Sequence, residues 1–340
     1  MQFRPLGSTG LSVSAISFGA GPVSGLLTSN SVDTQRSVIS RAIELGVNWF
    51  DTAATYGNGQ SEANLGAALA GIRSEQSLHV ATKVRVQLTT ETDLRPLVVA
   101  SVKESLARLR LPRVTLLQIH NSITRIRNDQ PTSITPEDVL GPTGLLAGME
   151  DVRAAGWVEH FGLTGIGDAD ALQTVMQSGR FATIQAPFHL LNPSALRATP
   201  AVLCDPDYGG FLQTAHALGM GIFAIRVFAA GALLGAEPSG HTLQTPFFPL
   251  SLYRRDQVRA LQLAEQIGSL AALREMALRY VLSQPQITSA IVGLGAIDHV
   301  EEAARIADLE LLSEGDLREL DGLCGSLSEL PHPAKPPRAG

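Results

Sequence analysis

The sequence predicts a (β/α)8 TIM barrel, in which eight parallel strands alternate with helices and close on themselves. Short apolar runs alternate with amphipathic stretches along the chain, and together they give eight strand–helix units. A chain of 340 residues is long enough for one barrel of this kind. No Gly-x-Gly-x-x-Gly motif follows a first strand, which disfavours an open dinucleotide-binding sheet. We therefore expect residues 1–330 to form a single barrel domain.

The first twenty residues predict a β-hairpin. A short strand is followed by a turn at Gly7-Ser8-Thr9-Gly10 and by a second extended run from Leu11 to Gly19. The end of that run, at Phe18, supplies the first barrel strand. A helix at 33–45 follows and closes at Gly46.

The rest of the chain continues the alternation. Seven further runs are predicted strands, at 47–50, 78–82, 114–119, 158–163, 182–186, 221–225 and 288–292. Further helices are predicted at 61–70, 91–109, 144–155, 168–179, 209–218, 257–283, 297–307 and 313–328. Residues 331–340 are rich in proline and predict a flexible tail.

Two connections, 121–143 and 226–256, are longer than a barrel needs. Both follow strands on the face where barrel active sites are built, so they are candidate binding loops or lids. In the first, Thr135 and Pro136 predict the start of a short helix, with a cap residue followed by proline.

Composition excludes several classes of protein. Hydrophobic residues make up 44% and charged residues 17%, as in ordinary globular proteins. A net charge of −6 argues against a nucleic-acid groove, and no apolar run approaches the ~20 residues that cross a bilayer. The N-terminus lacks the pattern of a signal peptide, so a cytoplasmic protein is expected. Cys204 and Cys324 are too few for a disulfide framework or a cysteine metal cluster, and no metal site is predicted.

Four polar residues fall at or just beyond the ends of successive predicted strands: Asp51, Tyr56, Lys83 and His120. Each alone has an ordinary explanation, since strand-end lysines often face solvent and histidines after apolar runs are often core residues. The carboxyl ends of barrel strands meet on one face, however, so the four side chains are expected to converge. Their convergence predicts an active site.

The chemistry of these residues fits proton transfer to a carbonyl oxygen. A cationic lysine stabilises the phenolate of a nearby tyrosine, and an aspartate fixes the lysine. A histidine can donate a hydrogen bond that orients the carbonyl group. Neither a water-activating metal site nor an activated Ser or Cys nucleophile is visible, which favours a reduction that takes hydride from a cofactor.

With these residues in place, the chain resembles the aldo-keto reductases. The resemblance runs from Arg4–Val13 to Ser289–Gly293, and its most specific part is the stretch Gly46–Gly57 followed by Ser61-Glu62 and Leu65-Gly66. The resemblance implies a barrel closed at its base by the N-terminal hairpin. It also implies an extended nicotinamide cofactor held at the other end without a Rossmann fold.

The family's catalytic tetrad of Asp, Tyr, Lys and His maps onto Asp51, Tyr56, Lys83 and His120 without substitution. The loop after the fourth strand and the stretch Phe228–Leu233 are similar to those of bacterial aldose and sugar dehydrogenases. The resemblance thus implies a small carbonyl or alcohol substrate.

The same resemblance implies cofactor-binding positions at Gly19 and Asp51 and further along the chain. Gln185 matches the glutamine that holds the nicotinamide carboxamide. Thr164 replaces a serine with the same hydroxyl, although Gly165 stands where the family commonly has asparagine.

After the seventh strand the family commonly has a stacking aromatic residue and then a serine near the pyrophosphate, whereas this chain has Ile225 and Arg226. The guanidinium of Arg226 can bind pyrophosphate oxygens, or a hydroxyl or acid of the substrate. A salt bridge at the barrel mouth is the structural alternative.

The last strand and the next helix bear on the choice between NAD and NADP. Gly293 and His299 match positions that contact the adenosine end, and Glu302 matches an adenine contact. Within Gly293–His299 only His299 can be cationic, and Asp298 beside it disfavours a 2′-phosphate and can accept from a ribose hydroxyl. NAD is therefore the preferred expectation over NADP.

The sequence leaves two other functions open. A barrel lysine can act as a Schiff-base nucleophile, which would make Lys83 the centre of an aldolase. The chain could also bind a nicotinamide cofactor without catalysis and sense its redox state. Neither the physiological substrate nor the oligomeric state follows from the sequence.

Overall fold

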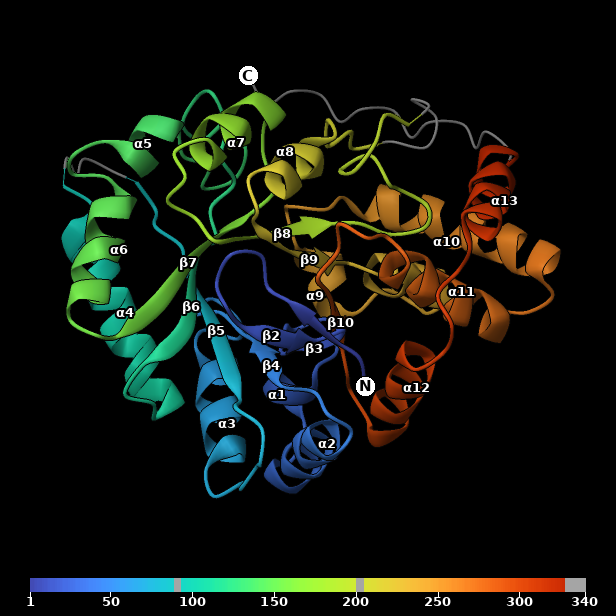
Figure 1. Cartoon of the computed structure of the whole chain (residues 1–340), viewed down its shortest axis with the longest axis horizontal. Helices are drawn as coiled ribbons and strands as arrows, with labels where there is room; N and C mark the ends of the chain where they lie inside the picture. The colour runs from blue at the N-terminus through green and yellow to red at the C-terminus, as the bar shows by residue number, and fades with distance from the viewer. Residues whose placement is uncertain (89–92, 200–204, 328–340) are drawn as a thin grey trace.

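The computed structural model describes residues 1–88, 93–199 and 205–327 and contains a closed barrel of eight parallel strands (Figure 1). The strands are β3 (Ile16–Gly19), β4 (Trp49–Asp51), β5 (His79–Val84), β6 (Val114–Ile119), β7 (Val158–Thr164), β8 (Thr183–Pro187), β9 (Gly221–Ile225) and β10 (Ser289–Gly293). They pair in chain order, and β10 pairs with both β9 and β3, which closes the ring. The predicted (β/α)8 fold is confirmed.

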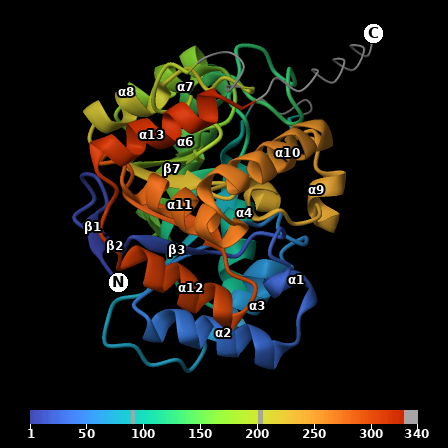
Figure 2. The same ribbon diagram turned by 90° about the vertical axis from the view of Figure 1, so that its right-hand side faces the viewer.

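Helices surround the strands, as Figures 1 and 2 show. They are α1 (Leu26–Ser29), α2 (Val32–Glu44), α3 (Gln60–Leu69), α4 (Arg95–Leu109), α5 (Pro136–Leu140), α6 (Leu145–Ala154), α7 (Ala169–Met176), α8 (Phe211–Ala217), α9 (Gly240–Gln244), α10 (Leu250–Ile267), α11 (Leu270–Leu282), α12 (Ile297–Ala307) and α13 (Glu314–Gly325), with a 3₁₀ helix η1 (Ala229–Leu234). The capped start of α5 is as predicted, with Thr135 accepting from the backbone of Asp138. Some predictions fall on residues outside the described ranges. They concern the tail 331–340, Cys204, and residues 91, 92 and 328 of two predicted helices.

The prediction of one helix over 257–283 is wrong. Gly268 has a φ of 113°, a backbone conformation that ends α10 and that a residue with a side chain rarely adopts. The Ser269 side chain then accepts from the backbone N–H of Ala272 at 3.1 Å and starts α11. The apolar pattern continues across this break because both helices pack on the same barrel, so periodicity alone did not reveal it.

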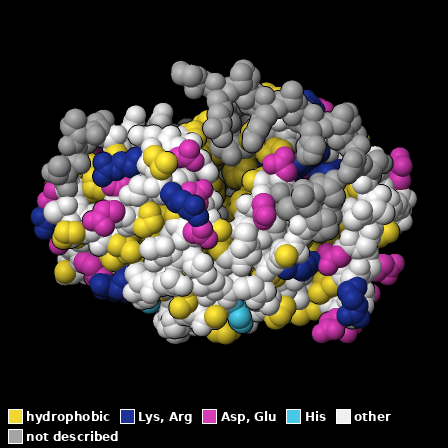
Figure 3. Space-filling view, turned by 90° about the horizontal axis from the view of Figure 1, so that it is seen from above, with side chains coloured by type: hydrophobic (Ala, Val, Ile, Leu, Met, Phe, Trp, Pro, Cys, Tyr) yellow, Lys and Arg dark blue, Asp and Glu magenta, His cyan; other side chains and the backbone are white. Residues whose placement is uncertain are grey.

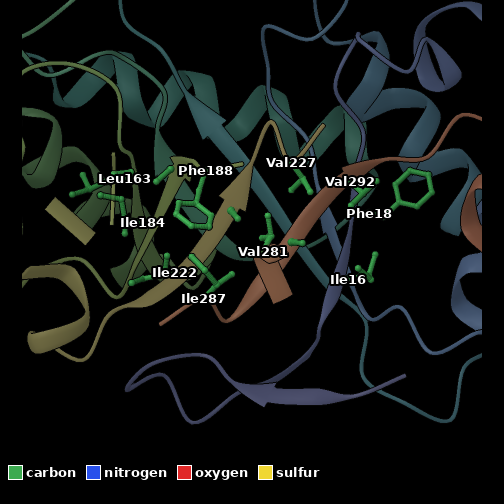
Figure 4. Packing of buried hydrophobic residues seen from close by; sticks show 14 of the residues in the cluster. Ile16, Phe18, Leu163, Ile184, Phe188, Ile222, Val227, Val281, Ile287 and Val292 are labelled. Atoms are coloured by element: carbon green, nitrogen blue, oxygen red, sulfur yellow. The ribbon is translucent and has the colours of Figure 1, made fainter. Parts of the chain in front are cut away.

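The N-terminal hairpin consists of β1 (Phe3–Pro5) and β2 (Ser12–Ser14), which pair antiparallel. The extended run expected from Leu11 to Gly19 is divided at Ala15, where the chain leaves the hairpin and enters the barrel as β3. Leu6 and Val13 of the hairpin pack against inward-facing barrel side chains, among them Trp49 and Phe223. The hairpin therefore closes the base of the barrel, and its ribbon lies below the strands in Figure 4.

Side chains of alternate strand residues face the barrel interior or the helices. Outward-facing residues such as Phe18, Leu163, Ile184 and Ile222 belong to the large hydrophobic layer between strands and helices (Figure 4). Among the described residues, no helix is both long and apolar enough to cross a membrane. On the face seen in Figure 3, basic and acidic side chains are interspersed around a central hollow.

Candidate active site

Lys83 is the centre of a buried polar cluster at the carboxyl ends of β4 and β5. Its side chain is 1% exposed and forms an ion pair with Asp51. Its Nζ also donates to the carbonyl oxygen of Thr52 at 2.8 Å and to the hydroxyl of Tyr56 at 3.3 Å. Burial alone would lower the pKa of Lys83, but attraction to Asp51 and Tyr56 outweighs it and raises that pKa. The ammonium group is thus charged, with all three donors engaged.

Asp51 is held by residues from three other strands. One carboxylate oxygen pairs with Lys83, and the other accepts from the amide of Gln118 at 3.1 Å and from the amide of Gln185. Gln118 was not predicted as a site residue, although a glutamine inside the apolar run of β6 is a usable signal. These contacts fix the carboxylate, and through it the lysine.

Tyr56 and His120 stand above this cluster. Their rings meet edge to face, at 83° with centroids 5.6 Å apart, and Thr55 lies 3.3 Å from the Nδ1 atom of His120. Burial, followed by the positive charges of Arg85 and Lys83, holds the pKa of His120 well below its ordinary value. The imidazole is therefore neutral near neutral pH and keeps one N–H to donate.

A cavity of about 890 Å³ opens over these residues, and Tyr56 and His120 form part of its wall. All the positions expected to contact a cofactor line the same cavity, namely Gly19, Asp51, Thr164, Gln185, Arg226, Gly293, His299 and Glu302. Lys83 is not on the wall and lies beneath Tyr56, with its Nζ 4.9 Å from the ring centre. The residues that line the cavity extend from β4 to α12. All the predicted site residues except Lys83 thus line one cavity.

The sequence matches a known protein family over most of its length. A model of the aldo/keto reductase family matches residues 15–324. The chain belongs to the aldo/keto reductase family.

Individual relatives are distant but cover nearly the whole chain. L-galactose dehydrogenase of Arabidopsis thaliana is 26% identical over 338 residues, with 98% of each chain covered. A Schizosaccharomyces pombe protein that bears the name voltage-gated potassium channel subunit beta is 28% identical, with 94% of this chain and 92% of that protein covered. The structure of glycerol dehydrogenase from Gluconobacter oxydans superposes with a TM-score of 0.70 at 21% identity, covering 98% of both chains, which confirms the fold.

Two groups at the nicotinamide end expected of an aldo/keto reductase fit a carboxamide. The Thr164 hydroxyl is buried and has no hydrogen-bond partner among the described residues. The Gln185 amide nitrogen donates to Asp51, and its remaining N–H and its carbonyl oxygen can serve a ligand. An orphaned buried hydroxyl is costly unless a ligand completes it, so these residues fit the group that the family uses.

Arg226 does not form the barrel-mouth salt bridge that was its structural alternative. No acidic side chain of residues 1–88, 93–199 or 205–327 pairs with its guanidinium, which instead stacks on the ring of Phe248 at 3.7 Å. Burial lowers the pKa of Arg226, and its positive charge faces the cavity. Its planar fork is suited to pyrophosphate oxygens.

The end of the cavity expected to take the adenosine holds a cation that was not predicted from the sequence. Arg274 of α11 lines the cavity and pairs with Glu302 at 2.7 Å. His299 accepts a hydrogen bond from the backbone of Gly295 at 3.3 Å. No sequence motif marks Arg274, because it lies in the helix before β10 and not in the stretch after it.

Proposed function

We propose that this chain is an NAD(P)-dependent oxidoreductase that interconverts a carbonyl and an alcohol, with Tyr56 as general acid and base. The observation that carries the proposal is the 3.3 Å hydrogen bond from Lys83 Nζ to the Tyr56 hydroxyl, made by a buried lysine paired with Asp51. A fixed positive charge beside the phenol stabilises the phenolate that proton transfer leaves behind.

The residues have distinct tasks in this reaction. A bound nicotinamide cofactor supplies hydride to the carbonyl carbon, or accepts it in the reverse direction. Tyr56 gives its proton to the carbonyl oxygen in reduction and, as phenolate, takes the proton of the alcohol in oxidation. Neutral His120 donates a hydrogen bond to the same oxygen and orients it. Asp51 keeps Lys83 charged and in place.

The cofactor is expected to lie along the wall formed by β7 to β10 and α12. Thr164 and Gln185 would hold the carboxamide, Arg226 the pyrophosphate, and Gly19, Gly293, His299 and Glu302 the remainder. NAD is expected to be preferred over NADP, since Glu302 neutralises Arg274 and since Asp298, beside His299 in the sequence, disfavours a 2′-phosphate. A sugar or small aldehyde is the expected substrate, and the name of the plant relative supports the sugar.

The test combines cofactor binding with turnover. The purified chain is titrated with NADH and NADPH and is then assayed on a panel of sugars, aldehydes and alcohols. Tyr56→Phe should lower turnover by ~100-fold or more, the scale of general acid catalysis, and leave cofactor affinity within about threefold. A Tyr56→Phe variant with near-normal turnover would falsify the assignment of the acid.

Two other functions give different results in the same test. A redox sensor would bind a cofactor tightly and turn over nothing. The relative named as a potassium channel subunit supports a role without catalysis, since that name is not an enzyme's. A Schiff-base aldolase would be trapped by borohydride and substrate as an adduct on Lys83. The ion pair with Asp51 argues against the aldolase, because a charged amine is not nucleophilic.

A further inference from the structure

Arg85 is a cation at the reacting end of the cavity that the chemistry above does not use. It follows β5, two residues beyond Lys83, and lines the cavity together with Tyr56 and His120. Its Nη2 donates to the carbonyl oxygen of His120 at 3.3 Å, and its guanidinium lies 4.6 Å from the ring centre of Phe247. Its Nε is buried and has no hydrogen-bond partner in the described part of the chain.

The barrel places Arg85 away from the expected cofactor. In the closed order of strands, β5 lies four strands from β9 in either direction, so Arg85 and Arg226 stand on opposite walls. Apart from Asp51, the positions expected to hold the cofactor lie on or after β7 to β10 and on β3, with Arg226 among them. Arg85 follows the strand that carries Lys83, between the strands of Tyr56 and His120. It therefore faces the space left for the substrate.

No acidic side chain of the described residues balances the charge of Arg85. No carboxylate in the described ranges pairs with it, and the acidic side chains on the cavity wall have other partners. Asp51 pairs with Lys83, Glu302 with Arg274 at 2.7 Å, and Glu237 with Arg254 at 3.0 Å. A guanidinium that is partly withdrawn from water without a counter-ion is costly, and burial lowers the pKa of Arg85.

The contacts of Arg85 leave it able to bind an anion. The guanidinium of Arg85 lies over the ring of Phe247, and apart from the Nη2 donor bonded to His120 its N–H groups have no hydrogen-bond partner among the described residues. A planar fork with free donors matches the two oxygens of a carboxylate. Arg85 also donates a hydrogen bond to the carbonyl oxygen of His120, the residue expected to orient the reacting oxygen.

We propose that Arg85 binds a carboxylate of the substrate, so that the enzyme acts on carbonyl compounds or alcohols that carry a carboxylate away from the reacting carbon. This inference rests on the proposed function and names its substrate class. Aldehyde acids and sugar acids belong to that class, and neutral sugars of the same length are the matched comparison.

The test uses pairs of probes in which one member ends in a carboxylate and the other ends in a neutral group. These are 4-oxobutanoate with its methyl ester, and D-glucuronate with D-glucose. The unaltered enzyme should show a kcat/KM at least about tenfold higher for each acid than for its neutral partner, as expected for a charge-assisted hydrogen bond. Arg85→Gln should remove this preference, mainly by raising KM for the acids, and leave the neutral probes within about threefold. Arg85→Lys should keep part of it.

Arg318→Gln is the matched control, since Arg318 is an exposed arginine of α13 outside the cavity. It should leave the acid-to-neutral ratio unchanged. An equal loss on acid and neutral probes in Arg85→Gln would overturn the inference, because it would make Arg85 a support for His120 alone. So would an unaltered enzyme that turns over the neutral probes at least as well as the acids. Both results leave the proposed oxidoreductase function intact.

Failure of the proposed function has a different signature. If no probe is turned over with either cofactor, binding of succinate measured by calorimetry still tests the anion site. Binding that weakens by about tenfold or more in Arg85→Gln supports the site, and absence of binding overturns it. If Arg85→Gln does not fold, the probe ratios of the unaltered enzyme and of Arg85→Lys decide the question.

Discussion

Two sets of polar side chains on opposite walls of the barrel mouth differ in whether they already have partners. On the wall of β4 to β6, the cluster of Lys83, Asp51 and Gln118 is hydrogen-bonded within itself and to the backbone. On the wall of β7 to β10, the Thr164 hydroxyl and the Arg226 guanidinium have no polar partner among the described residues. The Lys83 cluster is organised by the protein for chemistry before a ligand binds, whereas Thr164 and Arg226, like Arg85 beside the cluster, keep polar groups for a ligand.

This difference predicts whether a substitution changes folding stability, catalysis or cofactor binding. A change within the Lys83 cluster leaves a buried group unpaired, so it should reduce both catalysis and folding stability. A change of Thr164 or Arg226 removes a group that has no polar partner among the described residues of the free protein. It should reduce cofactor binding and leave stability almost unchanged.

Asp51→Asn should have the largest effect. It leaves the Lys83 ammonium buried without its counter-charge, which is expected to lower the free energy of unfolding by about 3–5 kcal/mol. Without Asp51, desolvation also favours the neutral amine, so turnover should fall by ~100-fold or more. Denaturant unfolding and kcat with a good aldehyde substrate measure the two effects.

The double variant Asp51→Asn/Lys83→Met separates them. Removing both charges should restore most of the stability, because a buried ion pair replaced as a whole is often close to neutral. Turnover should stay low, since the cation beside Tyr56 is gone. Equal stability of the single variant and the unaltered protein would contradict the view that the Lys83 cluster is held by its own pairs.

Arg226→Gln should have a smaller effect of another kind. Loss of a charge-assisted contact to pyrophosphate should raise the Kd for NADH and NADPH alike by ~10- to 100-fold. The free energy of unfolding should remain within about 0.5 kcal/mol, since the guanidinium has only a stacking partner, Phe248. Fluorescence titration and denaturant unfolding measure both. A destabilised variant with normal cofactor affinity would place Arg226 with the structural residues instead.

The sequence was most informative about the wall of β4 to β6, for a physical reason. Tyr56, Lys83 and His120 lie at or near strand ends, and alternation of strands and helices locates those ends without knowledge of packing. Asp51 could be predicted as a candidate site residue for the same reason. The barrel and its tetrad positions were therefore predictable.

The missed features depend on packing between elements far apart in the chain. Gln118 reaches Asp51 across two strand pairings, and Arg274 reaches the cavity from a helix that precedes its strand. The contact between Arg85 and Phe247 joins the segments that follow β5 and β9, which are half the barrel apart. No local sequence pattern predicts such contacts between distant residues. The break at Gly268 was missed because both helices share one apolar pattern.

The wall of β7 to β10 also has the ion pair of Glu302 and Arg274 beside it, and this pair offers the finest test of the comparison. Glu302 holds Arg274 at 2.7 Å, and both side chains are about one-third exposed. Glu302→Gln should release the guanidinium for a 2′-phosphate, so the ratio of kcat/KM with NADPH to that with NADH should rise by about three- to tenfold.

Glu301→Gln is the matched control, because Glu301 is the neighbouring residue of α12 and pairs with Arg41 of α2 instead. It should leave the cofactor ratio unchanged. A ratio that rises equally in both variants would mean that net charge, and not the release of Arg274, sets the preference. A rise of the cofactor ratio confined to Glu302→Gln would show that the ion pair with Glu302 prevents Arg274 from binding a 2′-phosphate. In that pair the carboxylate would withhold the cation from the ligand. In the pair of Asp51 and Lys83, by contrast, the carboxylate holds the cation in position beside Tyr56.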